Sequence, residues 1–310
     1  MILFGHNVSE PAQVADLVAA FRDAVGYADA PVLIDQEGGR VQRLKPPHWS
    51  SYPPGRHYGQ LFAVDAQAGK RAAWLGVRLI AHDLHALGIT VDCLPVLDVP
   101  AKSGHDVIGD RAYGEDVETV VTLAGLWPKV WLWAAFCRSP SMCRGRGWAG
   151  ADSYLELPRV DTPAVDLEAV DFEPFRRLSG LPLAMTAHVV YTAYDALNPA
   201  TTSKRMIDDV IRGIIGFDGC LMSDDLSMQA LAGALGDRAQ VAFDAGCDLA
   251  LHCNGDMAEM TEVAARSPEL TGAPLRRAKA ALDARSEPKP LDEQAAREEL
   301  RALLARLADR

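Results

Sequence analysis

Residues 31–35 of this 310-residue chain read Pro31-Val-Leu-Ile-Asp35, a short run of apolar side chains that ends in a carboxylate. Such a run, bounded by Gly, Pro or polar residues, is typical of a strand buried on both faces of a parallel sheet. The same pattern recurs along the chain at Ile2–Phe4, Ile89–Pro95, Leu181–His188, Cys220–Asp224 and Cys247–His252. These runs predict a parallel β-sheet.

Amphipathic stretches with helix signals lie between these runs. Pro11–Val25 follows a Ser9-Glu10 start, Val64–Leu87 is a long helix ended by Gly88, and Ser203–Ile215 is followed by Gly216. Alternating strands and helices indicate an α/β fold. A doubly wound sheet and a (β/α)8 TIM-type barrel both fit, and the barrel is favoured because its usual size is about 250 residues.

The C-terminal region predicts two closing amphipathic helices, Ala278–Ala284 and Leu291–Leu307. In the second, the apolar positions point inward and the charged positions face solvent. The inward positions are Leu300, Leu303, Leu304 and Leu307. We therefore expect a single domain over residues 1–310.

Composition excludes several classes of protein. The chain has 31 Lys and Arg against 42 Asp and Glu, a net charge of −11 and a pI near 5.2, so a nucleic-acid partner is not expected. Its longest apolar stretches, such as Leu181–Met185, fall short of the roughly 20 residues of a membrane span, and residues 1–6 lack the pattern of a secretory signal. We expect a cytoplasmic monomer. The six cysteines show no paired CxxC spacing, so we expect free thiols and no metal.

Polar side chains follow most of the predicted strands. Alone, each is explained as a helix cap or loop carboxylate. Together they matter, because barrel active sites gather at the carboxyl ends of the strands. Acidic groups there suit a site that binds sugar hydroxyls and stabilises a cationic, oxocarbenium-like transition state. The residues are Asp35, Gln36, Glu37, Asp98, His188, Asp224, Asp225 and His252.

The run Leu33-Ile-Asp-Gln-Glu-Gly-Gly-Arg-Val-Gln-Arg-Leu44 resembles the DQEGGRVQR signature of glycoside hydrolase family 3, in its β-N-acetylhexosaminidase branch. Other segments match the family in order, and together they cover nearly the whole chain. They are Leu94–Asp98, Ile108–Gly114, Asp152–Pro158, Leu221–Met228 and Ala245–Gly255.

The resemblance implies a barrel enzyme that removes terminal N-acetylglucosamine from β-linked glycosides, with muropeptides from cell-wall recycling as the usual small-molecule substrate and no cofactor. It implies a retaining mechanism, in which a carboxylate attacks the anomeric carbon and water hydrolyses the glycosyl ester. Asp224 matches the family nucleophile. We interpret Asp225 as a supporting group or helix cap.

The same resemblance assigns substrate-binding roles. Asp35 is expected to accept hydrogen bonds from sugar hydroxyls, while Arg43 and Arg111 donate to the sugar or its N-acetyl group. The alternative for Arg43 is a surface ion pair with Glu37, worth at most about 1 kcal/mol. We expect the glycine pair at 38–39 to let this loop approach the ligand closely.

The acid/base position departs from the family pattern. The branch uses a histidine on a loop, oriented by an aspartate two residues earlier, whereas this chain reads Asp152-Ser153-Tyr154. Tyrosine, with an ordinary pKa near 10, is poorly matched to proton transfer at neutral pH. We predict that Tyr154 costs at least the ~100-fold rate factor of general acid–base catalysis.

The window 126–150 is anomalous. It contains four of the six tryptophans and no acidic residue, and it lacks the Lys-His-x-Pro-Gly-His-Gly motif that the family has there. Read from the third base of each codon, Trp127–Arg144 can encode AEGLAVGGVLPVAKHVPG, with Ala forced at Trp127 and Gly at Trp133. We interpret the window as frameshifted, with the frame restored before Ala151. The alternative is a divergent, Trp-rich loop, in which Trp131–Cys137 is apolar enough to pair as the fourth strand.

Met1-Ile-Leu-Phe4 resembles the second strand of the family, so about one βα unit is expected to be missing. Either the true start lies upstream or the barrel has an exposed edge. Two further functions stay open: a catalytically silent homologue that binds amino sugars, and a family 3 glycosidase that acts on glucose or xylose.

Overall fold

A computed structural model describes residues 1–100, 108–126, 133–135, 157–285 and 290–307, with only the backbone described at 133–135. Its main strands form two parallel sheets. The first has the order β1 (Ile2–Leu3), β2 (Leu33–Ile34), β5 (Val91–Asp92). The second has the order β11 (Leu249–Leu251), β10 (Cys220–Asp225), β8 (Leu183–Met185), β6 (Trp133–Ala135). The predicted parallel strands are confirmed, although most are shorter than the apolar runs that predicted them.

The backbone of residues 133–135 forms a strand where the sequence expected the fourth one. Trp133 is in register with Leu183, and Ala135 with Met185, so β6 pairs with β8 in parallel. The rest of the window 127–156, including Asp152 and Tyr154, lies outside the described residues. The expected pairing of Trp131–Cys137 is therefore confirmed for its central three residues.

Two smaller pairs were not predicted. β3 (Gln36–Gly38) and β4 (Val41–Gln42) form an antiparallel hairpin directly after β2. β7 (Arg159–Val160) and β9 (Val190–Tyr191) form a parallel pair. The hairpin matters for the site, because it folds the Asp-Gln-Glu-Gly-Gly-Arg segment back over the end of β2.

The described residues contain more helices than the sequence predicted. α1 (Pro11–Val25) is confirmed at both ends, since Pro11 occupies its first turn and Gly26 ends it in the left-handed conformation. The long helix expected at Val64–Leu87 is confirmed as α3 (Ala66–Ala86), and Gly88 follows it in the left-handed conformation. It begins two residues later than expected, because Asp65 caps it by accepting hydrogen bonds from the N–H groups of Gln67 and Ala68. The helix before it, α2 (Gly55–Val64), was not predicted.

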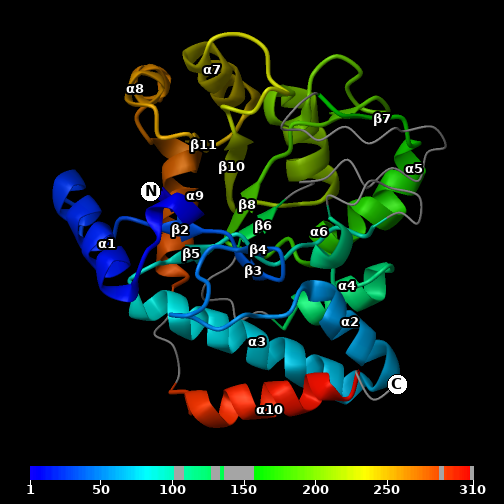
Figure 1. Cartoon of the computed structure of the whole chain (residues 1–310). Coiled ribbons are helices and arrows are strands. Elements are labelled where there is room, and N and C mark those ends of the chain that lie inside the picture. Colours follow the sequence, from blue (N-terminus) through cyan, green and yellow to red (C-terminus); the bar gives the residue numbers. More distant parts are fainter. Residues whose placement is uncertain (101–107, 127–132, 136–156, 286–289, 308–310) are drawn as a thin grey trace.

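The remaining helical segments surround the sheets (Figure 1). The one predicted at 203–215 is wound with wider i to i+5 turns over Met206–Ile214. Figure 1 shows α10 lying along α3. The bounds are η1 Gly5–Asn7, η2 Gly109–Arg111, α4 Val117–Ala124, α5 Ala164–Asp166, η4 Leu167–Asp171, α6 Glu173–Arg177, η5 Ala200–Thr202, η6 Met206–Ile214, α7 Leu235–Ala245, α8 Met257–Arg266, α9 Gly272–Asp283 and α10 Glu293–Ala305.

The predicted apolar face of α10 is confirmed. Leu300 is buried in the main core, and Leu303, Leu304 and Leu307 pack partly buried against it. Within the described part of the chain, no helix is long and apolar enough to cross a membrane.

The two sheets share one interior. A cluster of buried side chains joins Leu33 and Val91 of the first sheet to Met185, Met222 and Leu251 of the second. The fold is therefore α/β, as predicted. The strand ladders of the described residues form two separate sheets, however, and do not by themselves establish the closed eight-stranded barrel that the sequence favoured.

Candidate active site

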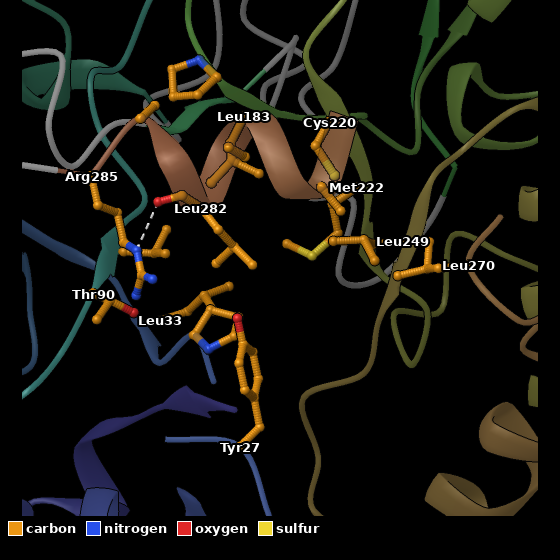
Figure 2. A pocket seen from close by; sticks show the side chains of 16 residues that line it. Tyr27, Leu33, Thr90, Leu183, Cys220, Met222, Leu249, Leu270, Leu282 and Arg285 are labelled. Carbon is orange, nitrogen blue, oxygen red and sulfur yellow. Dashed lines mark hydrogen bonds between the residues drawn. The ribbon is translucent and has the colours of Figure 1, made fainter. Parts of the chain in front are cut away.

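An apolar cavity of about 260 Å³ marks one end of the sheets (Figure 2). Leu33 and Val91 line it from the first sheet, Leu183 and Leu249 from the second, and Leu282 from α9. Strands of both sheets start at this cavity, so their carboxyl ends gather at the opposite end. No Asp or Glu is among the described residues that line the cavity, which makes it unsuited to sugar hydroxyls.

The predicted acidic site lies toward the carboxyl ends. Leu33 and Met222 belong to the shared interior cluster, and side chains two residues apart along a strand point to the same face. Asp35 and Asp224 follow them by two residues each. The fold thus aims both carboxyl groups into the interior, beyond the apolar layer, and both residues are buried. This is the placement that the sequence predicted.

Hydrogen bonds hold Asp224 in place. The carboxylate oxygen Oδ1 of Asp224 accepts from the N–H of Asp225 at 2.8 Å. The backbone N–H of Asp224 donates to the hydroxyl of Thr186 at 3.3 Å. Because Asp225 belongs to β10 and Thr186 directly follows β8, the carboxyl group has a defined direction.

The carboxylate of Asp225 is committed to local structure. Its Oδ1 accepts from the N–H groups of Ser227 at 3.0 Å and Cys253 at 3.1 Å, and its Oδ2 accepts from the Ser227 hydroxyl at 2.7 Å. These bonds tie the end of β10 to the chain after β11. They are the contacts expected of the supporting role assigned to Asp225.

Arg43 pairs with Asp35, not with Glu37. Its Nη2 lies 2.7 Å from Asp35 Oδ2, and its guanidinium stands 5.4 Å from the centre of the Phe4 ring. The alternative of a surface pair with Glu37 is wrong, because the β3–β4 hairpin brings Arg43 back beside the end of β2. The pair places a carboxylate, which accepts hydrogen bonds, beside a guanidinium, which donates them, and a polyol can bind to both kinds of group.

Glu37 instead binds Arg111 in a buried, two-pronged ion pair. Arg111 Nε and Nη2 each donate to one carboxylate oxygen at 2.7 Å, and the side chains of Glu37 and Arg111 are 3% and 9% exposed. Beside it, Arg40 and Asp110 form a half-exposed pair at 3.0 Å. Sequence reasoning named Arg111 but missed Glu37 as the residue that orients it.

The glycine pair at 38–39 serves packing within the chain. Gly38 has φ +89°, and a Cβ atom there would lie 2.4 Å from the carbonyl oxygen of Pro53. A Cβ on Gly39 would lie 2.7 Å from a side-chain carbon of Pro54. The close approach of the hairpin to residues 52–54 is therefore one reason for glycine at both positions. The expectation that the pair lets the loop approach the ligand closely stays a prediction.

Asp92 is a buried acid in β5, and the sequence analysis did not name it as a candidate site residue. Its Oδ1 accepts from the N–H of Gln36 at 2.9 Å. Burial, reinforced by the nearby carboxylates of Glu37 and Asp35, raises the pKa of Asp92 well above its ordinary value. A carboxyl residue within an otherwise apolar strand was the signal available in the sequence.

The other polar residues expected at strand ends do not all face the site. Asp98 and His188 are buried, and His188 is hydrogen bonded on both ring nitrogens. His252 is different, since its Nε2 lies 3.6 Å from Glu259 of α8. The preceding residue, Leu251, points into the shared interior, so the alternation of the strand turns His252 outward.

No group of three or more His, Cys, Asp or Glu that could hold a metal ion occurs among the described side chains. The cysteines in this part of the chain, Cys93, Cys220, Cys247 and Cys253, are free thiols, as expected. The expected catalytic and substrate-binding residues that the structure describes, Asp35, Arg43, Arg111 and Asp224, are carboxylates and arginines.

The sequence matches the model of the glycosyl hydrolase family 3 N-terminal domain over residues 1–282. The chain belongs to this family. It is 40% identical over 258 residues to the β-hexosaminidase of Alkalilimnicola ehrlichii, an alignment that covers 82% of this chain and 73% of that protein. The family membership predicted from the DQEGGRVQR motif is confirmed, and the chain is a glycoside hydrolase.

Solved structures agree with the family assignment. The fold is similar to native NagZ from Neisseria gonorrhoeae, with a TM-score of 0.79 and 30% identity over 98% of this chain and 88% of that one. It is equally similar to the same protein in complex with N-trifluoroacetyl-D-glucosamine, with a TM-score of 0.79 and 29% identity over 99% and 89% of the two chains. The α/β fold of family 3 is thus established for this chain.

Proposed function

We propose that this protein is a retaining β-N-acetylhexosaminidase that removes terminal β-linked N-acetylglucosamine from muropeptides in the cytoplasm, as a monomer. One observation carries the proposal: in a family 3 chain, Asp224 sits on the interior face of β10 with its carboxylate held by the N–H of Asp225. The neighbour solved with N-trifluoroacetyl-D-glucosamine supports an N-acetylated amino sugar as the ligand class.

In this mechanism Asp224 attacks the anomeric carbon as the glycosidic bond breaks, and a glycosyl ester forms. Water then attacks the same carbon, and the carboxylate leaves with its electron pair. Asp35 and Arg43 bind sugar hydroxyls, and Arg111, held by Glu37, donates to the sugar or its N-acetyl group. The 2.7 Å contacts of both arginines with carboxylates support these roles, because they preset the direction of the donors.

Proton transfer is assigned to the Asp152–Tyr154 loop. Tyr154 donates a hydrogen bond to the leaving oxygen but is a weak acid and a weaker base near pH 7, since its ordinary pKa is near 10. Turnover therefore depends steeply on the leaving group. Dinitrophenolate leaves without being protonated, so dinitrophenyl glycosides react far faster than alkyl glycosides.

Hydrolysis of 4-nitrophenyl N-acetyl-β-glucosaminide tests the proposal, with the glucoside and the xyloside beside it. We expect the N-acetyl sugar to have the highest kcat/KM, and Asp224→Asn to abolish turnover. Asp218→Asn is the matched control, because Asp218 precedes the amino end of the same strand and its side chain is 64% exposed. Equal kcat/KM for all three sugars overturns the substrate assignment.

A second candidate is a catalytically silent homologue that binds amino sugars. The tyrosine at position 154, where the family branch has its histidine, favours it. Calorimetric binding of N-acetylglucosamine without hydrolysis of the dinitrophenyl glycoside would establish this candidate in place of the enzyme.

We further infer that the two sheets are arcs of one (β/α)8 barrel and that the window 126–150 is frameshifted. The apolar cluster and cavity common to both sheets support the barrel. Sequencing the coding DNA from upstream of Met1 to the codon of Tyr154 tests the frameshift. Compensating insertions or deletions that restore KHVPG and a histidine are expected, and an unchanged reading refutes it.

A further inference from the structure

A chain of buried polar groups runs behind the candidate nucleophile. His188 Nε2 lies 2.9 Å from the carbonyl oxygen of Asp225, and His188 Nδ1 lies 2.8 Å from the hydroxyl of Thr201. That hydroxyl lies 2.8 Å from the hydroxyl of Thr186, which accepts from the N–H of Asp224 at 3.3 Å. His188, Thr186 and Thr201 are at most 1% exposed. The chain thus begins and ends on adjacent residues of β10.

A single arrangement of protons satisfies every group in it when the imidazole is neutral. The carbonyl of Asp225 can only accept, so His188 Nε2 carries the hydrogen and Nδ1 is an acceptor. Thr201 therefore donates to Nδ1 and accepts from Thr186. Thr186 in turn accepts from the backbone of Asp224. Buried networks in which every member is satisfied make a structure rigid.

The two ends of the network act on the same carboxylate. The N–H of Asp225 holds Oδ1 of Asp224 at 2.8 Å, and the carbonyl of that same Asp225 is held by His188. The backbone of Asp224 is held through Thr186. Rotation of either peptide group would turn the carboxylate, and both of these contacts lead back to the imidazole of His188.

We propose that His188 is a positioning residue for the attack of Asp224, acting through Thr201 and Thr186 on one side and the Asp225 carbonyl on the other. It does not touch the sugar. The inference rests on the proposed function, and it adds a residue whose effect is on the rate of attack. A misplacement of about 1 Å in a reacting group can lower a rate about 100-fold.

The test measures formation of the glycosyl ester alone. The full-length protein is mixed with a 5-fluoro analogue of dinitrophenyl N-acetyl-β-glucosaminide, whose ester accumulates, and the covalent adduct is followed by intact mass. This leaving group needs no proton, so Tyr154 does not limit the rate. We expect His188→Asn to slow adduct formation about 100-fold with KM changed less than about twofold.

Two substitutions separate the two arms of the network. His188→Gln keeps a donor near the Nε2 position, and Thr201→Val breaks the other arm while the imidazole stays in place. We expect an intermediate loss for each, with Thr201→Ser restoring the rate. If His188→Asn fails to fold, Thr201→Val and Thr201→Ser carry the test.

The matched control is His252→Asn, because His252 also follows a strand and its side chain is 6% exposed, but it faces Glu259 instead of β10. It is expected to form the adduct within about twofold of the wild-type rate. If His188→Asn folds and forms the adduct at the wild-type rate, the positioning role alone is overturned. If His188→Asn does not fold, the wild-type rate in Thr201→Val overturns it in the same way. A wild-type protein that forms no adduct overturns both this inference and the proposed function.

Discussion

The buried pair of Glu37 and Arg111 and the half-exposed pair of Arg40 and Asp110 join the same two segments, the β3–β4 hairpin and η2. The two ion pairs therefore differ in burial but connect the same segments, so their contributions to stability can be compared directly. Glu37→Gln removes the carboxylate from the pair with Arg111, whose side chain is 9% exposed. Asp110→Asn removes the carboxylate from the pair with Arg40, whose side chain is 42% exposed.

The expected losses differ severalfold. Removing one partner of a buried ion pair costs about 3–5 kcal/mol, and Gln places the effect near the lower end because it still accepts one hydrogen bond. A solvent-exposed pair contributes about 0–1 kcal/mol, because water and salt screen it. We therefore expect Glu37→Gln to lower the free energy of unfolding by about 3 kcal/mol and Asp110→Asn by less than about 1 kcal/mol.

Urea unfolding of the whole chain, followed by circular dichroism at low and high salt, measures both variants. Salt should reduce the small effect of Asp110→Asn and leave that of Glu37→Gln nearly unchanged. Turnover of the N-acetylglucosaminide should fall in Glu37→Gln and hold in Asp110→Asn. Losses within about 0.5 kcal/mol of each other would refute the view that burial decides the strength of this connection.

Three other perturbations test the scaffold. Gly38→Ala should lower stability by at least about 2 kcal/mol, since φ is +89° and the new Cβ would meet a proline carbonyl. Asp92→Asn should abolish a loss of stability that the wild type shows as pH rises above about 4, the ordinary pKa of an aspartate. The folded-state pKa of Asp92 is raised by burial, so the folded protein holds a proton that the unfolded chain releases as pH rises. Asp248→Asn should cost about 3 kcal/mol, because this carboxylate is 1% exposed and accepts from two arginines and a backbone N–H.

Each of these has a control. Gly216→Ala has a positive φ of 74° but open space around its Cβ, so a loss equal to that of Gly38→Ala would show that the clash is unimportant. For Asp92, an unchanged slope of stability against pH in the Asn variant would assign the slope to other groups. Asp218 shares Arg277 with Asp248 but is 64% exposed, and Asp218→Asn should cost less than about 1 kcal/mol.

Local patterns were enough to predict the class of fold. Six apolar runs of the sequence became parallel strands, because a strand buried on both faces needs apolar residues at every position. The bounds of α1 were also predictable, since Pro11 and Gly26 act through their own backbone geometry. Three segments that resemble the family likewise located Asp35, Arg43, Arg111 and Asp224, although their catalytic and binding roles remain proposals.

The partners of these residues were decided by the tertiary structure. Glu37 and Arg111 are 74 residues apart, and Asp225 meets His188 across 37 residues, so their pairing depends on how the strands and loops are brought together. The β3–β4 hairpin brings Arg43 into contact with Asp35, and this hairpin depends on the tight packing of Gly38 and Gly39 against residues 52–54. Residue type determines which interactions a side chain is able to make, whereas the distance and burial that select one of them arise only when the whole chain is folded.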